Sequence, residues 1–506
     1  MAITNISALW DLDSSTRVFD YLNSSGNEII QVQNFIENQF LDPEHTPQWI
    51  NSFAPRSGKV RAIVPRSPPN IVEYAVNVAS QAFSTWSKST VQRRSEILHR
   101  IASIMEQKIE LFVVWESIDH GKPLFRARAE VERSIEHFRY FANYILENDI
   151  PVHHNRGLGM ATMTYEHRAP VGVYTIITSW NMPLYLLTSK IAPCLAFGCT
   201  GVAKPSELTS ITAFLFSEVL RRANLPAGVM NIIFGDGPGT GSTLVRSPLV
   251  HGVSFTGGVE TSIQIRENTA SDIHKILFLE IRGSCPTIVF PDVDLKEAAI
   301  TAASAAFENG GQLSLSGSRI YVHRSIHQSF LRELSQIVKS EYHKYTGLSP
   351  AISPEHYAKI LSYLVEAGDN PARVIFQTGH IPGHVPSDGF WIPSTLLSNV
   401  SIDNLPRQEL FGPVATVYPF DTEEDVVRLC NANPHGIGAL ILTRDMLRMG
   451  RVGRDLDAGI VWANCHLGRD LGAGITDLRA IGTGRGGGAH CRDMFTRLLA
   501  LHVPSF

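Results

Sequence analysis

Residues 171–204 read VGVYTIITSWNMPLYLLTSKIAPCLAFGCTGVAK, and this stretch decides the fold. An apolar, β-branched run at 171–178 is followed by a helical pattern at 185–195 and a second short run at 200–203. The alternation continues with a helical pattern at 211–222 and an apolar run at 229–234. Strands that alternate with helices in this way predict a parallel sheet with helices on both faces.

The flanking sequence extends this pattern in both directions. Towards the N-terminus, the spacing of apolar side chains predicts amphipathic helices over 71–87, 91–107 and 129–147. Residues 152–167 alternate like a two-stranded ribbon, which either pairs with another subunit or packs on its own chain. After residue 290 a second alternating region runs to about residue 475, as expected for a chain of 506 residues, which is too long for one core.

Composition limits the classes of partner. The formal net charge is -4 and charged residues make up 18% of the chain, so nothing indicates a nucleic acid partner. The apolar runs are far shorter than the roughly 20 residues of a membrane helix, and no secretory signal is readable. We therefore expect a soluble, cytoplasmic protein without a membrane partner. The six cysteines lack paired metal spacing, so we expect no metal site and reduced, mostly buried thiols.

Two further stretches carry candidate chemistry. Residues 307–319 read FENGGQLSLSGSR: an alanine-rich helical segment leads into a Gly-Gly turn that presents the hydroxyl of Ser314. A serine needs a positioned base to become a nucleophile, and no Ser-His-Asp arrangement is legible around this one. Residues 235–241, GDGPGTG, follow a predicted strand and open a helix, so bare backbone could approach a phosphate there.

Motifs in sequence order resemble those of the aldehyde dehydrogenase family. Residues 179–184, SWNMPL, look like P-W-N-F-P-L, 204–207 match K-P-S-E, and 255–258, FTGG, are similar to F-T-G-S. Residues 279–284, LEIRGS, resemble the E-L-G-G-K segment, 409–414 resemble E-I-F-G-P-V, and 307–314 resemble F-x-N-x-G-Q-x-C. The resemblance covers about residues 30–506. It implies an α/β fold with a Rossmann-type NAD-binding domain, an α/β catalytic domain and a β-ribbon oligomerisation arm.

The resemblance also implies roles for single residues. Asn181 would hold the developing oxyanion, Glu280 would be the general base, and Ser314 stands at the position of the nucleophile. The residues implied to bind NAD, with NADP left open, are Trp180, Lys204, Glu207, Phe255, Thr256, Gly257, Gly258, Glu409 and Phe411. Taken singly, Asn181 could instead cap a helix, and Lys204 could belong to a surface turn.

Domains and substrate contacts follow from the same likeness. It implies a dinucleotide-binding domain over 20–148 and 168–279, a catalytic domain over 280–478, and an oligomerisation ribbon and tail over 149–167 and 479–506. A homodimer or homotetramer is therefore expected. Residues 464–471, NCHLGRDL, are similar to the subgroup that oxidises 2-aminomuconic and 2-hydroxymuconic semialdehydes, in which two arginines bind the substrate carboxylate. Arg469 and Arg133 are the matches here, although either could instead form a structural ion pair.

Several residues depart from the family pattern. Ser314 replaces the cysteine, Arg282 replaces a glycine that lies beside the nicotinamide and the substrate, and Gly486 stands where relatives carry a glutamate. A single laboratory substitution would not produce all of these changes. Natural divergence is therefore favoured over an engineered cysteine-to-serine form.

The favoured hypothesis is a repurposed enzyme that binds an unsaturated aldehyde or a related small carbonyl compound. It would move a proton or rotate a double bond without oxidation. Glu280, with a pKa raised by burial, would be the acid and base, and Arg282 or Arg469 would stabilise enolate charge. The alternatives are NAD-dependent oxidation of a semialdehyde to an acid, and a catalytically silent subunit.

Overall fold

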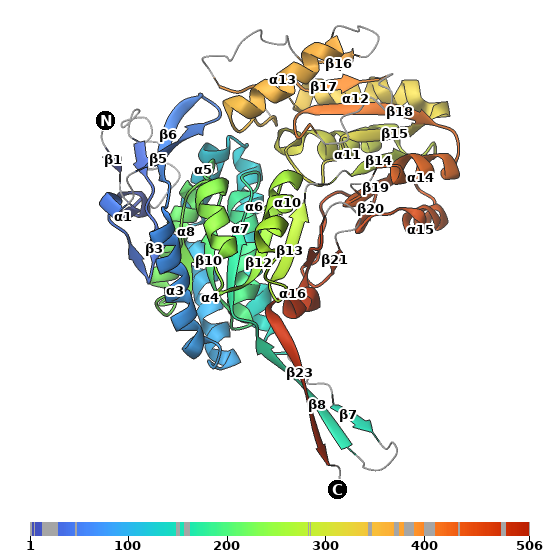
Figure 1. Ribbon diagram of the computed structural model, residues 1–506. Coiled ribbons are helices and arrows are strands. Elements are labelled where there is room, and N and C mark those ends of the chain that lie inside the picture. The colour runs from blue at the N-terminus through green and yellow to red at the C-terminus, as the bar shows by residue number, and fades with distance from the viewer. Residues whose placement is uncertain are drawn as a thin grey trace.

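The computed structural model describes residues 3–4, 6–12, 29–45, 48–147, 152–155, 162–281, 283, 285–342, 347–368, 374–378, 389–398, 410–433, 436–476 and 482–504. Figure 1 shows how its elements are arranged. The first sheet has the strand order β13 (Ile276–Ile281), β12 (Val250–Gly257), β9 (Val173–Ile177), β10 (Thr200–Lys204), β11 (Met230–Ile232), β3 (Phe35–Ile36) and β4 (Gln39–Phe40). Strands β9 to β13 pair in parallel, which confirms the α/β sheet expected from residues 171–204.

The winding of this sheet reverses between β9 and β12. The parallel part of the sheet begins at β9, continues outward through β10 and β11, and then crosses back to add β12 and β13 on the other side of β9. The carboxyl ends of β9 and β12 therefore lie side by side at a topological switch point. Open α/β sheets bind their ligands at such a point.

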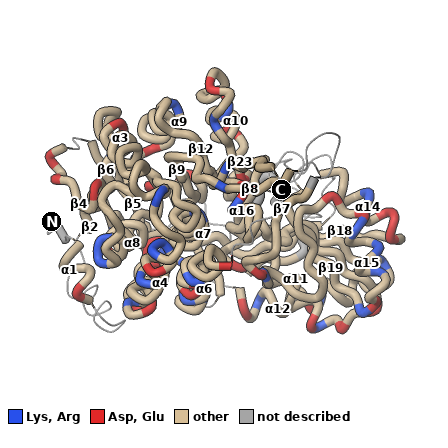
Figure 2. The backbone as a smooth tube through the Cα atoms, turned by 90° about the horizontal axis from the view of Figure 1, so that it is seen from below, with Lys and Arg blue, Asp and Glu red and all other residues tan. Residues whose placement is uncertain are grey.

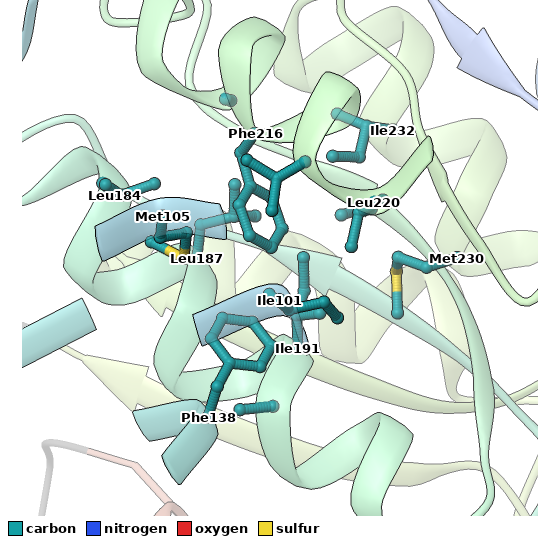
Figure 3. Packing of buried hydrophobic residues seen from close by; sticks show 14 of the residues in the cluster. Ile101, Met105, Phe138, Leu184, Leu187, Ile191, Phe216, Leu220, Met230 and Ile232 are labelled. Carbon is teal, nitrogen blue, oxygen red and sulfur yellow. The ribbon is translucent and has the colours of Figure 1, made fainter. Parts of the chain in front are cut away.

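Alternating side chains of the strands build a core on each face of the first sheet. Val173 and Ile177 of β9 pack with α3 (Pro69–Trp86), α9 (Ser242–Arg246) and α10 (Val259–Thr269). Tyr174 and Ile176 face the opposite core, formed by α4 (Val91–Gln107), α5 (Ile109–His120), α6 (Leu124–Tyr144), α7 (Pro183–Ala196) and α8 (Ile211–Arg222). Figure 3 shows this second core at close range, where side chains from α4, α6, α7 and α8 meet.

The second sheet has the order β16 (Val374–Gln377), β17 (Thr395–Leu397), β18 (Val414–Phe420), β15 (Arg319–His323), β14 (Pro286–Val289), β19 (Gly438–Leu442) and β20 (Ile460–Ala463). The alanine-rich α11 (Leu295–Phe307) and α12 (His327–Glu341) cover one face. The other face packs against α14 (Glu423–Asn431) and α15 (Met446–Asp455). The helix α13 (Pro354–Gly368) packs near β17 in a separate cluster.

A ribbon projects from the body of the molecule, as Figure 1 shows. It consists of β7 (Val152–Asn155), β8 (Thr162–Pro170) and the C-terminal β23 (Thr496–Pro504), paired antiparallel. The smaller elements are β1 (Ile3–Thr4), α1 (Ile6–Trp10), β2 (Ile29–Gln31), β5 (Trp49–Ala54), β6 (Lys59–Pro65), β21 (Ile475–Thr476), β22 (Arg485–Gly486) and α16 (Gly488–Phe495). Within the described residues no helix is long and apolar enough to span a bilayer.

Helix boundaries follow the sequence pattern closely, and the largest difference lies at the start of α6. The helix α4 spans the predicted residues 91–107. The helix predicted from residue 129 begins at Leu124 and ends at Tyr144, because Pro123 stands at its N-cap, where a proline is tolerated. Charges of both signs are interspersed on the outer helices such as α4, α6 and α15, as Figure 2 shows.

Candidate active site

The carboxyl edge of the first sheet carries most of the predicted site residues. Strand β9 leads into Trp180 and Asn181, and β10 ends at Lys204. The register of the sheet pairs Thr256 of β12 directly with Glu280 of β13. The topological switch point therefore collects residues that lie far apart in the sequence.

Ser314 follows a tight turn after α11. Gly310 and Gly311 have φ angles of 66° and 68°, in the left-handed region that favours glycine. A Cβ on Gly311 would lie 2.1 Å from the carbonyl oxygen of Gly412, so a larger residue does not fit. The buried side-chain amide of Gln312 donates to two backbone carbonyl oxygens, each at 3.0 Å. The close approach at Gly311 and the two Gln312 hydrogen bonds thus fix the backbone that leads into Ser314.

Two asparagines join this turn to the end of β9. Nδ2 of Asn181 donates to the carbonyl oxygen of Gln312 at 3.0 Å, and Nδ2 of Asn309 donates to the carbonyl oxygen of Asn181 at 2.9 Å. A side-chain amide has two N–H donors, so Asn181 keeps one for a substrate oxygen. Asn181 is not the cap of the next helix, because the N-cap position of α7 is Met182.

A cavity of about 540 Å³ is lined both by residues at the carboxyl edge of the first sheet and by residues next to the second sheet. Ser314, Asn181 and Glu280 all line it, so the structure brings the three predicted catalytic residues together. Other lining residues include Arg126, Glu130, Arg133, Glu136, Met182, Tyr185, Thr256, Leu313, Trp462, Leu467 and Arg469. A cavity of this size with a few convergent polar groups suits a small organic molecule.

Glu280 accepts two short hydrogen bonds through one carboxylate oxygen. Nζ of Lys190 and Oγ1 of Thr256 both lie 2.7 Å from its Oε2. Burial raises the pKa of Glu280, but the Lys190 charge, both hydrogen bonds and Arg469 outweigh burial, so the pKa lies below its usual value. The prediction of a raised pKa for Glu280 is wrong. The strand pattern in the sequence indicates that Glu280 is buried, but it does not reveal that the Lys190 ammonium group lies beside the carboxylate. Glu280 is therefore an anionic base at neutral pH.

We expect Lys190→Met to move the acid limb of the kcat/KM profile to higher pH by about 1 to 3 pH units. Without the ammonium group, burial dominates, the pKa of Glu280 rises, and the base is lost at a higher pH. Arg469 remains as a charged neighbour among the described residues, and Cys491 is neutral because burial raises its pKa to about 11. The measurement is kcat/KM for an aldehyde with NAD as a function of pH.

The matched control for this prediction is Lys190→Arg, which keeps a positive charge beside the carboxylate. Its acid limb should stay close to that of the unsubstituted protein. Coinciding profiles for Lys190→Met and the unsubstituted protein would show that Lys190 does not set the protonation state of the base.

Two arginines meet at one wall of the cavity. Arg133 donates through Nη1 to Glu136 at 2.7 Å and through Nη2 to the carbonyl oxygen of Arg469. Nearby, Arg126 forms an ion pair with Glu130 at 3.4 Å. Among the described residues, Arg469 has no ion-pair partner and its Nε has no hydrogen-bond partner. The geometry therefore supports a structural ion pair for Arg133 and leaves Arg469 available to a ligand.

A second group of predicted residues fits a dinucleotide. Nζ of Lys204 donates to the carbonyl oxygen of Gly235 at 2.7 Å and lies 3.3 Å from the carboxylate of Glu207. Gly258 is the N-cap of α10, and within the described part of the chain no side chain caps this helix and a Cβ on Gly258 would meet no atom within 4 Å. Backbone N–H groups left free at a helix N-terminus bind phosphate. The arrangement thus offers a place for a ribose and a pyrophosphate.

An aromatic pair lies at the same edge of the first sheet. The rings of Trp180 and Phe411 pack edge to face with centroids 5.4 Å apart, and both side chains are buried. Phe411 has a φ of 55°, and a ring nitrogen of His356 lies 2.7 Å from its carbonyl oxygen. The contact between the Trp180 and Phe411 rings packs the segment that begins at residue 410 against the end of β9.

Some predicted residues lie elsewhere or have another task. The ring of Phe255 is buried in the core below α10, so its side chain is not available to a cofactor. Gly257 accommodates that ring, since a Cβ there would lie 2.4 Å from it. The hydroxyl of Thr256 donates a hydrogen bond to the carboxylate of Glu280. Arg282, Glu409 and the ribbon tip at 156–159 lie outside the described residues, and their roles stay predictions.

Sequence reasoning missed the cations that organise the site. Lys190 is the charged residue of α7, PLYLLTSKIAPCLA, and a lysine in an otherwise apolar helix was an available signal. Lys122 is fully buried, donates to Glu130, and lies 3.7 Å from Glu116. Its Nζ also lies 3.4 Å from the carbonyl oxygen of Asn181. No sequence signal marks this network, because the helix break at Gly121 resembles a surface turn.

Comparison with known proteins places the chain in a family. The model of the aldehyde dehydrogenase family matches residues 40–500. The chain is 36% identical to the 2-aminomuconic semialdehyde dehydrogenase of Mus musculus over 94% of this chain and 99% of that protein. It is 34% identical to the 2-hydroxymuconic semialdehyde dehydrogenase of Pseudomonas sp. (strain CF600) over 92% of this chain and 98% of that protein.

A solved structure agrees with this match. The NAD+ complex of an aldehyde dehydrogenase from Bacillus cereus is similar with a TM-score of 0.88 and 27% identity, covering 96% of this chain and 98% of that one. The fold is therefore that of the aldehyde dehydrogenases. The chain belongs to the aldehyde dehydrogenase family.

These comparisons correct the favoured functional hypothesis. The names of the relatives describe the oxidation of a semialdehyde and not an isomerisation. The prediction of a redox-neutral isomerase is therefore wrong, and the oxidative alternative fits better. The departures at Ser314 and Gly486 led to the wrong hypothesis because a changed side chain in a site does not by itself indicate a changed reaction.

Proposed function

We propose that the protein oxidises a semialdehyde that carries a carboxylate to the corresponding acid, with NAD as the hydride acceptor. The observation that carries this proposal is Arg469, a cation without an ion-pair partner among the described residues, in the cavity that Ser314, Asn181 and Glu280 line. The relatives named for semialdehyde oxidation support the same interpretation.

Residues around the cavity would position such a substrate. The guanidinium group of Arg469 would bind the carboxylate, to which its planar fork is suited. The remaining N–H of Asn181 would donate to the aldehyde oxygen as negative charge develops there. Glu280, held anionic by Lys190, would accept a proton from water.

The residues present fit NAD. When bound, NAD supplies the acceptor for the hydride that leaves the aldehyde carbon. Lys204 and Glu207 would hold a ribose, the N-terminus of α10 the pyrophosphate, and Phe411 the nicotinamide end of the site. The carboxylate of Glu207 would repel a ribose phosphate, which favours NAD over NADP.

We expect Arg469→Gln to raise the KM for a carboxylate-bearing aldehyde roughly 30- to 100-fold, the loss of one charged hydrogen-bonding contact. The KM for an aldehyde without a carboxylate should change little, because it makes no such contact. The measurement is NADH formation with both substrates, together with mass spectrometry of the acid product.

The control is Arg128→Gln, which removes an exposed arginine of α6 that pairs with Glu110 outside the cavity. Equal increases of KM for both aldehydes in Arg469→Gln would assign Arg469 a structural role. If no semialdehyde yields NADH and acid, the proposed function itself is wrong.

We further propose that copies of the chain associate through the ribbon, as a homodimer or homotetramer. Leu498, Leu499 and Leu501 of β23 are each more than half exposed, which favours contact with another surface.

A further inference from the structure

Glu280 stands between two cavities. On one side lies the cavity of about 540 Å³ that also contains Ser314 and Asn181. On the other side lies a smaller cavity of about 80 Å³, here termed the rear chamber, lined by residues including His137, Ser189, Lys190, Ser254, Glu280, Arg469, Gly486 and Cys491. Glu280, Arg469 and Gly486 are among the residues that line both cavities, so Glu280 stands between them.

The rear chamber is large enough and polar enough to hold water. Its volume exceeds the roughly 10 to 15 Å³ that one water molecule requires. Ser254 is one of its lining residues, and the buried Oγ of this serine has no hydrogen-bond partner among the described residues. Buried hydroxyls without a protein partner are usually satisfied by ordered water. Lys190 and Glu280 supply further polar atoms at the same chamber.

Gly486 lines both cavities and carries no side chain. A Cβ at this position would lie 3.0 Å from Nη2 of Arg469, so a side chain here would enter the space next to the guanidinium group. With glycine at this position, no side chain occupies that space.

Ser314 has no base hydrogen-bonded to it among the described residues. Within the described part of the chain, its hydroxyl makes no hydrogen bond to a carboxylate or an imidazole. An unactivated serine is a weak nucleophile. Water next to an anionic carboxylate is the better placed nucleophile in this cavity.

We propose that the protein is also an aldehyde hydratase, in which Glu280 activates water from the rear chamber for direct addition to the aldehyde carbon. The inference rests on the proposed function for its substrate class, a carboxylate-bearing aldehyde, and the resulting gem-diol is the species that the proposed oxidation would convert to the acid. An O–H bond of water breaks, and its proton passes to Glu280. A C–O bond forms at the carbonyl carbon, and the carbonyl oxygen, held by Asn181, then takes that proton back. No oxidant and no cofactor take part in this addition.

The test follows the exchange of the aldehyde oxygen with isotopically labelled water in the absence of NAD. With para-carboxybenzaldehyde as the probe, mass spectrometry measures the rate at which label enters the carbonyl group. The protein should accelerate exchange over the uncatalysed rate, and Glu280→Gln should lower the catalysed rate about 100-fold or more, the usual contribution of a general base. Ser314→Ala should retain at least about half of it, since no bond to the serine forms.

The rear chamber is tested by Ser254→Val, which removes its buried hydroxyl and adds bulk. We expect the exchange rate to fall about tenfold, as for the loss of one buried hydrogen-bonding group. The matched control is Thr175→Val, an isosteric change at a buried hydroxyl of β9 that lines neither of the two cavities. Melting temperatures of both variants establish that they fold, and if Ser254→Val does not, the Glu280 and Ser314 variants still decide the proposal.

Two outcomes overturn the hydratase proposal: exchange no faster than in buffer, or exchange abolished by Ser314→Ala as fully as by Glu280→Gln. In either case NADH formation from the same aldehyde would show that the proposed oxidation stands. Conversely, rapid exchange without NADH formation would sustain the hydratase and reject the dehydrogenase.

Discussion

Ser314→Cys is expected to raise the rate of NADH formation from a semialdehyde by about 100-fold or more. A thiol ionises near pH 8.5 and is intrinsically far more nucleophilic than a hydroxyl. The substitution adds a covalent route to a cavity that already contains an amide for the oxyanion and an anionic base. The turn before residue 314 should not change, because Gln312 and the two glycines fix it independently of this side chain.

The measurement is the steady-state rate with saturating NAD, combined with the intact mass of the variant during turnover. The matched control is Ser316→Cys in the same loop, where the serine is buried and donates to the backbone of α11. It should show no gain. A correctly folded, NAD-binding Ser314→Cys protein without faster oxidation would mean that the cavity is not arranged for thiol chemistry.

Lys122→Met is expected to lower the free energy of unfolding by about 3 to 5 kcal/mol, because it leaves the buried carboxylate of Glu116 without the cation beside it, whereas Glu130 keeps Arg126. Lys122 is fully buried, donates to Glu130, and lies 3.7 Å from the buried carboxylate of Glu116. Burial already raises the pKa of Glu116, and the Lys122 charge opposes that shift. Loss of the lysine should also lower activity, since its ammonium group contacts the backbone of Asn181.

Urea denaturation followed by circular dichroism measures this change. The comparison is Arg93→Met, which breaks an exposed pair between Arg93 and Glu96 and should cost less than about 1 kcal/mol. A loss of stability for Lys122→Met as small as that of the control would show that the buried cluster is hydrated or rearranges freely.

The sequence allowed the fold to be predicted because local signals and global topology agree. Alternating strands and helices specify the parallel sheet, and the strand ends then place Asn181, Lys204 and Thr256 at one edge. The turn before Ser314 could be predicted because its left-handed backbone requires glycine at positions 310 and 311, whereas the role of Ser314 is implied by the family resemblance and stays a prediction. These inferences depend on short stretches whose geometry is fixed by neighbouring residues.

The electrostatic properties of the site could not be predicted in the same way. The pKa of Glu280 depends on Lys190, which lies on a different element, and the distance between such residues exists only in the folded chain. Phe255 illustrates a second limit: the family motif implied a cofactor contact at this position, whereas strand alternation turns its side chain into the core. A burial pattern reveals desolvation but not the ions that oppose it.

Glu280 lies near the end of the edge strand β13 of the first sheet, whereas Ser314 precedes β15 of the second. The base and the hydroxyl therefore belong to segments attached to different sheets, here called the two halves of the molecule. A fragment with either sheet alone would present only one of the two groups, so chemistry would require both halves to dock. Substitutions at the contact between the halves can then change the reaction without altering any residue that touches the substrate.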